Sequence, residues 1–140
     1  MIGMWRLGLA CGLALGASLA WAEDFPDLKG TWKGTNEAVV LGQGAHHPNP
    51  GGQAGPRTTN TDFTVTFAGQ DGRRFWGTIA SPTATEPLLG VFASDRQTLY
   101  MADVDGYTIA KLTSDGKIDM CYLRSGKDMT LAACLLLAKQ

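Results

Sequence analysis

The stretch that decides the fold is residues 63–81, FTVTFAGQDGRRFWGTIAS. Its first part alternates strictly, with Phe63, Val65 and Phe67 on one face and threonines between them, which is the period of a half-buried strand. A Gln-Asp-Gly sequence follows, and Asp-Gly strongly favours a tight hairpin turn. Residues 73–81 then read as a second strand. The stretch therefore predicts an antiparallel β-hairpin.

The same pattern extends along the chain on both sides of this hairpin. Short segments of period two recur with turn residues between them, and helical periodicity is hard to find beyond residue 22. The last strand alone has an alternative, because its run of Ala and Leu also suits a helix. The expected strands are residues 30–40, 63–69, 73–81, 88–94, 98–104, 107–114, 117–124 and 129–139.

Eight consecutive strands with mostly short connections make an antiparallel meander. An open meander has two unpaired edges, and closing the sheet on itself removes both of them. The sequence therefore predicts an all-β fold, an eight-stranded antiparallel up-and-down barrel that forms one domain over residues 23–140. The competing two-sheet sandwich would need long crossovers, and the chain has only one long connection, residues 41–62.

That connection, LGQGAHHPNPGGQAGPRTTNTD, is rich in glycine and proline and almost free of apolar residues. Such a segment buries too little surface to offset its ordering entropy. Long loops of this kind are usually lids over a site or disordered linkers. Because the segment joins the first two strands, we expect a flexible loop at one mouth of the barrel.

The first 22 residues are expected to be a cleaved secretory signal peptide. Arg6 ends a short n-region, an apolar run follows, and the segment closes on Ala-Trp-Ala. A membrane anchor is the alternative, but the run is short and interrupted by glycines, whereas a bilayer span needs about 20 apolar residues. Cys11 lies inside the run rather than at its end, which argues against lipidation. We therefore expect a periplasmic or secreted protein without a membrane span.

The expected mature chain keeps two cysteines, Cys121 and Cys134, and an even number in an exported chain indicates a disulfide. Both lie on the last two expected strands. If the turn centres between Lys127 and Asp128, they are directly opposite; if it centres between Gly126 and Lys127, they are diagonal on one face. Either register allows a cross-strand bridge, and two free thiols are the alternative.

Charge and motifs narrow the classes of function. The formal net charge is −1, with 12 basic and 13 acidic residues. The basic residues are scattered, so the chain lacks the electrostatic footprint of a nucleic-acid-binding protein. The sequence has no recognisable Ser-His-Asp signature, phosphate loop or HExxH motif. It therefore gives no positive sign of an enzyme, and no cofactor is expected.

Residues 30–34, GTWKG, at the front of the meander resemble the avidin and streptavidin family and the wider calycin group, which includes lipocalins. In those barrels a Gly-x-Trp near the start of the first strand packs its ring across the closed end, and the resemblance assigns that role to Trp32. Gly30 and Gly34 would let the strand coil around such a plug. Avidins ring biotin with several tryptophans, whereas the expected mature chain has only Trp32 and Trp76. The resemblance thus implies the fold and a pocket, but not biotin.

Candidate ligand-binding residues come from the long loop and the expected pocket walls. His46, His47 and Arg57 are the groups of the loop able to reach inward. The histidine pair has no Asp, Glu or Cys close by in sequence, so no metal site is expected. Solvated loop positions are the alternative for both histidines. The other candidates, for which ordinary core positions are the alternative, are Asn36, Trp76, Phe92 and Tyr100.

Three functions are compatible with these expectations. The first is non-catalytic binding of a small, partly apolar ligand at the barrel mouth, under the long loop. The second is protein binding, such as inhibition of a secreted protease or lytic enzyme. The third is an enzyme that uses the mouth, for which the sequence offers no motif. A sizeable apolar cavity would support the first function, and a barrel filled by side chains would support the second.

Overall fold

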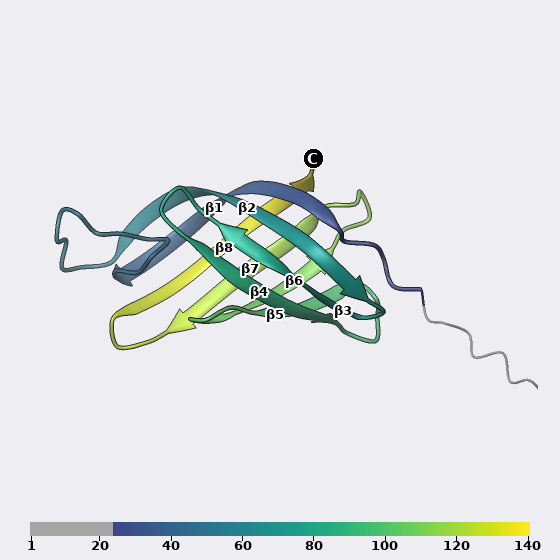
Figure 1. The fold of residues 1–140 in the computed structure, drawn as a ribbon. Helices are drawn as coiled ribbons and strands as arrows, with labels where there is room; N and C mark the ends of the chain where they lie inside the picture. The colour runs from purple at the N-terminus through teal and green to yellow at the C-terminus, as the bar shows by residue number, and fades with distance from the viewer. Residues whose placement is uncertain (1–23) are drawn as a thin grey trace, which may run out of the picture.

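The computed structural model describes residues 24–140, and the expected signal peptide at residues 1–22 lies outside them. Consecutive strands pair antiparallel in chain order, and β8 pairs with β1, so the sheet closes (Figure 1). The expected eight-stranded meander barrel is confirmed. Within residues 24–140, no helix is long and apolar enough to cross a membrane. The strands are β1 (Gly30–Gly42), β2 (Arg57–Asp71), β3 (Arg74–Ala80), β4 (Thr85–Phe92), β5 (Thr98–Ala102), β6 (Tyr107–Leu112), β7 (Ile118–Ser125) and β8 (Met129–Lys139).

The main difference from expectation is the connection between β1 and β2. β1 continues to Gly42 and β2 begins at Arg57, so the expected loop at 41–62 narrows to residues 43–56. Val40 pairs with Arg57, and the ladder between the two strands runs on from there to Phe67. The threonines at the start of β2 explain the extension, because β-branched residues favour strands. The expected loop boundaries are therefore corrected.

Apolar side chains fill the barrel interior. On β8, the residues Met129, Leu131, Ala133, Leu135 and Leu137 are buried, and those between them are more exposed. A helix would bury every third or fourth residue instead of every second one. This period excludes the helical alternative for the last segment.

Trp32 lies buried at one end of the barrel, as the plug interpretation requires. Its indole Nε1 donates a hydrogen bond to the Leu28 carbonyl at 2.8 Å. Two residues further, Gly34 allows β8 to approach closely, because a Cβ there would lie only 2.4 Å from the Leu136 carbonyl oxygen. Gly30 has a φ of 123°, a conformation that L side chains rarely adopt. Gly30 thus allows the unusual backbone conformation at the start of β1, and Gly34 allows β8 to approach closely.

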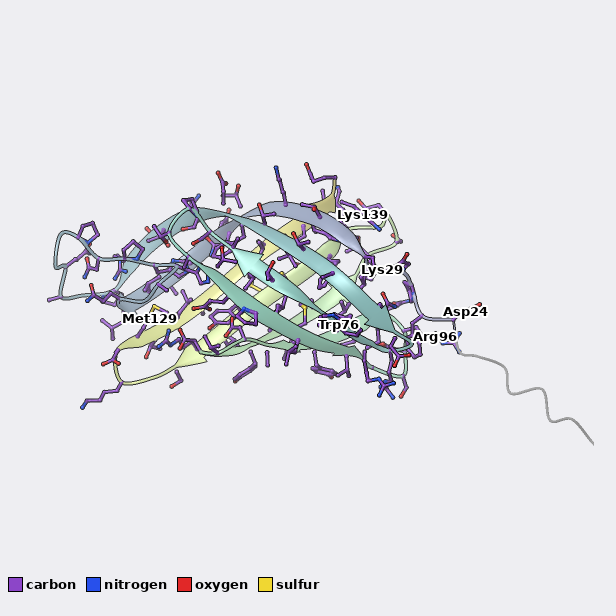
Figure 2. All side chains as sticks on the ribbon, in the orientation of Figure 1. Asp24, Lys29, Trp76, Arg96, Met129 and Lys139 are labelled. Carbon is purple, nitrogen blue, oxygen red and sulfur yellow. A yellow bond between two sulfur atoms is a disulfide. The ribbon has the colours of Figure 1, made fainter. Side chains whose placement is uncertain are left out.

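The two ends of the barrel differ. The end that contains Trp32, which we call the base, is covered by the segment before β1, where the Phe25 ring packs against Phe92 with centroids 5.5 Å apart. The opposite end, which we call the mouth, carries the β1–β2 loop and the β3–β4, β5–β6 and β7–β8 turns. Met129 lies at the mouth and Arg96 at the base (Figure 2). The β1–β2 loop projects beyond the barrel (Figure 1).

Cys121 and Cys134 form a disulfide with an S–S distance of 2.03 Å. The two residues are direct cross-strand partners on β7 and β8. This is the register in which the turn centres between Lys127 and Asp128. The expected bridge is confirmed, and it ties the last hairpin together.

Candidate functional site

The mouth is closed by residues 43–48, which we call the lid. Gly44 and His47 exchange backbone hydrogen bonds of 3.1 and 3.2 Å, so this part of the chain forms a tight turn. The hydroxyl of Thr83, in the β3–β4 turn, donates to the Ala45 carbonyl at 2.7 Å. The lid is therefore fastened to the rim of the mouth at the β3–β4 turn.

Arg57, the first residue of β2, is the second anchor of the lid. Its guanidinium donates to the carbonyl oxygens of Gly42, His47 and Pro48, the last two at 3.0 and 3.4 Å. Arginine carries five donors in a rigid fork, so one side chain can hold several carbonyls. Arg57 thus holds the lid backbone, and it does not reach the space beneath the lid as we had expected.

His46 is almost buried between the lid and the core. Its Nδ1 lies 2.7 Å from the Ser81 hydroxyl oxygen, and its ring packs on Phe63 with centroids 5.3 Å apart. Its Nε2 lies 3.3 Å from Glu86 Oε2 without forming a hydrogen bond, and within residues 24–140 this buried nitrogen has no hydrogen-bond partner. The contact with Glu86 is therefore electrostatic, and its strength depends on the charge of the imidazole.

His47 is 3% exposed, and its Nδ1 lies 3.3 Å from the Thr59 hydroxyl. Burial lowers the pKa of His47 from 6.5 to about 4, and the charges of His46 and Arg57 act in the same direction. The imidazole is therefore neutral at pH 7. The burial of both rings excludes the alternative of two solvated loop residues.

A recess lies beneath the lid. It encloses about 490 Å³ of space between atoms, counting the part open to solvent, but only about 30 Å³ can take the centre of a water molecule. The smaller volume decides which molecules fit, and it corresponds to about two water molecules. Apolar side chains form the deep wall: Phe63, Ile79, Met120, Leu131 and Leu135. Polar side chains form the rim: Asn36, His46, His47, Glu86, Asp103, Asp105, Tyr122 and Arg124.

Carboxylates dominate the charge of this rim. Arg124 pairs with Asp105 at 2.6 Å, and Asp103 accepts hydrogen bonds from the Tyr122 hydroxyl at 3.3 Å and from two backbone amides of the β5–β6 turn. Burial, assisted by the charges of Asp103 and Asp105, raises the pKa of Tyr122, so the phenol stays a donor. Within residues 24–140, Glu86 has only a lid histidine close to its carboxylate. The rim therefore carries three carboxyl groups and one guanidinium.

Asn36 on β1 is buried and lines the same recess. Its Oδ1 accepts a hydrogen bond from the Thr61 amide at 2.9 Å. A buried polar group left unpaired costs about 1–3 kcal/mol. Asn36 and the unpaired Nε2 of His46 thus line the same small space.

Three of the expected pocket residues lie elsewhere. Trp76 and Tyr100 are 45% and 53% exposed on the outside of the barrel, because their neighbours Phe75 and Leu99 take the inward positions. Phe92 does point inward, but it lies at the base and packs against Phe75. The expectation that these residues line a pocket with the loop histidines is therefore corrected. Strand alternation alone would have excluded Trp76 from the barrel interior once Phe75 was assigned to the core.

The sequence did not indicate three of the site residues, Ser81, Glu86 and Tyr122. They come from the β3–β4 turn, β4 and β7, and no short motif marks them. Ser81 and Glu86 contact His46 of the lid, and Tyr122 lines the recess beneath it.

No set of three or more His, Cys, Asp or Glu residues in the described part of the chain is arranged to hold a metal ion.

A scan against protein-family models and searches of curated proteins and solved structures found no match to this chain. The closed antiparallel barrel is consistent with a calycin-like fold. Since one fold hosts many functions, the barrel alone does not define the function.

Proposed function

We propose that the chain is an exported, non-catalytic barrel that binds a small ligand with a positively charged end at its mouth. The observation that carries this proposal is the polar rim, where the buried Nε2 of His46 has no hydrogen-bond partner within residues 24–140 and lies 3.3 Å from the carboxylate of Glu86. A buried charge is normally paired, and a cationic guest would supply the missing partner.

The chemistry of the rim suggests how such a guest is held. An ammonium or guanidinium group would donate to Glu86, while the Asn36 NH2 group would donate to an adjoining oxygen of the guest. The apolar deep wall, with the Phe63 ring, would take up hydrocarbon. The ligand class is therefore a small, partly apolar cation.

The size of the recess requires the lid to move. About 30 Å³ admits no more than about two water molecules, so a larger guest must displace the lid. The lid is held by a few hydrogen bonds, each worth about 0.5–1.5 kcal/mol net. Its displacement would cost a few kcal/mol, which contacts to the guest can offset.

Two further observations support the proposed export and the proposed ligand binding. The Cys121–Cys134 disulfide suits an oxidising compartment, as expected for a periplasmic or secreted protein. The resemblance of residues 30–34 to avidins favours a barrel that binds a ligand at one end.

Amide shifts in NMR spectra test the proposal, with methylammonium and guanidinium as cationic probes and acetate as the anionic control. The cations should shift the amides of residues 44–47 and of Glu86, and Glu86→Gln should abolish these shifts. Glu37→Gln, on the exposed outer face of β1, is the matched control and should keep them. Equal shifts with acetate, or cation shifts that survive Glu86→Gln, would contradict the proposal.

Protein binding is the second candidate, because a filled barrel favours a partner outside. The loop tip, residues 49–56, projects beyond the barrel (Figure 1) and is ordered by two hydrogen bonds between Asn49 and Gln53, of 3.0 and 3.2 Å. A loop ordered in advance loses less entropy on binding.

Inhibition assays against a panel of secreted proteases and lysozymes test this candidate. The comparison variant lacks residues 51–55, whose three glycines have no neighbour within 4 Å of an added Cβ. Protein binding through the tip predicts that the full-length chain inhibits at least one enzyme and the shortened chain does not. Equal behaviour of the two chains would reject it, without bearing on cation binding at the rim.

A further inference from the structure

We propose that the outer face of β3–β6 binds a second copy of this chain, so that the protein is a twofold-symmetric dimer. The interface is an apolar belt of six residues: Trp76, Leu89, Val91, Tyr100, Tyr107 and Ile109. Each of these side chains is 42–62% exposed. Isolated exposed hydrophobic residues are ordinary, but contiguous ones mark an interaction surface.

The strand register makes the belt contiguous. Trp76 pairs with Leu89, and Tyr100 pairs with Val91 on one side and with Ile109 on the other. Cross-strand partners on one face have Cβ atoms about 5 Å apart. The belt is therefore one patch across four strands rather than six separate residues.

A second row passes beside the first. Leu89 pairs with Ala102, and Ala102 pairs with Tyr107. The small side chain of Ala102 lies in a shallow hollow of the outer surface, which Trp76 and Tyr100 also line. The patch thus combines a hollow with a neighbouring strand, β6, that carries exposed large side chains.

This combination suits self-association. A twofold axis through the patch would lay Tyr107 and Ile109 of each copy over the hollow of the other, and isologous contacts need such self-complementarity. The belt itself contains no charged residue, and Arg74, which lines the same hollow, already pairs with Asp71. With a formal net charge of −1, two copies repel each other little.

The area of the belt matches what a stable dimer needs. Three aromatic and three aliphatic side chains, each about half exposed, present roughly 500 Å² of apolar surface. A standard interface buries about 800 Å² per partner, of which about 65% is apolar in homodimers. The belt therefore supplies about all of the apolar area that one partner buries in a standard homodimer interface.

Trp76 gives the belt a fixed anchor. Its ring covers Gly69 on β2, where an added Cβ would lie 2.3 Å from Trp76 Cζ2. The strand pairing shifts between Phe67 and Gly69, so the ring lies over a bulge. An aromatic side chain that is ordered before binding loses little entropy in the interface.

Sedimentation equilibrium on the purified chain tests the proposal. Wild type should have the mass of two chains at about 100 μM and dissociate on dilution. Leu89→Lys and Tyr100→Lys should sediment as monomers with unchanged circular dichroism. Leu136→Lys is the matched control, because Leu136 is 48% exposed on β8, outside the belt, and it should remain dimeric.

A second measurement needs no variant. On dilution of the labelled wild type, NMR amide shifts should change on β3–β6 and stay constant on β1 and β2. A monomer at about 100 μM, or a dimer that Leu136→Lys disrupts as strongly as Leu89→Lys, would overturn the proposal. A monomeric wild type would leave the belt to a different protein.

Discussion

Replacing Trp32 with alanine tests the plug at the base of the barrel. Trp32 is 3% exposed, meets the Phe67 ring edge-on with centroids 6.4 Å apart, and bonds the Leu28 carbonyl. The substitution removes roughly 150 Å² of buried apolar surface, about 4 kcal/mol at 25 cal/mol/Å². The lost hydrogen bond adds about 1 kcal/mol. We expect the free energy of unfolding to fall by about 4–5 kcal/mol, in the upper range for truncated buried aromatics.

Urea denaturation followed by far-UV circular dichroism measures this loss. Trp32→Phe keeps most of the apolar surface and removes the indole donor, so it should cost about 1–2 kcal/mol. Leu136→Ala, on the exposed face of β8, should cost less than about 0.5 kcal/mol. A loss below about 1 kcal/mol for Trp32→Ala would refute the plug, because a buried ring of this size cannot be removed so cheaply.

Three further predictions concern the lid and the disulfide. The pKa of His47 is about 4 in the folded chain and 6.5 unfolded, so the unfolded chain binds more protons between these values. The free energy of unfolding should therefore fall as the pH drops from 6.5 to 4, and a His47→Gln variant that keeps the full decline would contradict this assignment. Arg57→Ala should speed hydrogen exchange of the lid amides at least tenfold, about 1.4 kcal/mol, whereas Arg74→Ala, at an exposed ion pair, should leave it unchanged; equal rates in both variants would show that the lid does not need this anchor. Non-reducing peptide mapping should recover Cys121 linked to Cys134, and replacing both with serine should cost about 3 kcal/mol for a sequence separation of 13; free thiols in protein from an oxidising compartment would count against the bridge.

The sequence by itself determined the strands and their order. Alternation is local: it depends on which side chains of one segment are apolar, as in Phe63, Val65 and Phe67. Short turns between neighbouring strands left few possible topologies. Closure was favoured because it pairs the two edge strands that an open meander leaves unpaired. The disulfide could be foreseen for the same reason, since Cys121 and Cys134 lie on one hairpin. Trp32 was recognisable from the two glycines around it.

Only the tertiary structure decided the site. His46, Ser81 and Glu86 belong to a loop, a turn and a strand that meet because the closed sheet brings their ends to one mouth. The outward orientation of Trp76 and Tyr100 depended on which neighbour took the inward position. Whether the barrel is hollow depends on the summed volume of all inward side chains at the diameter that closure imposes. Such quantities belong to the whole barrel, so no single segment of the sequence contains them.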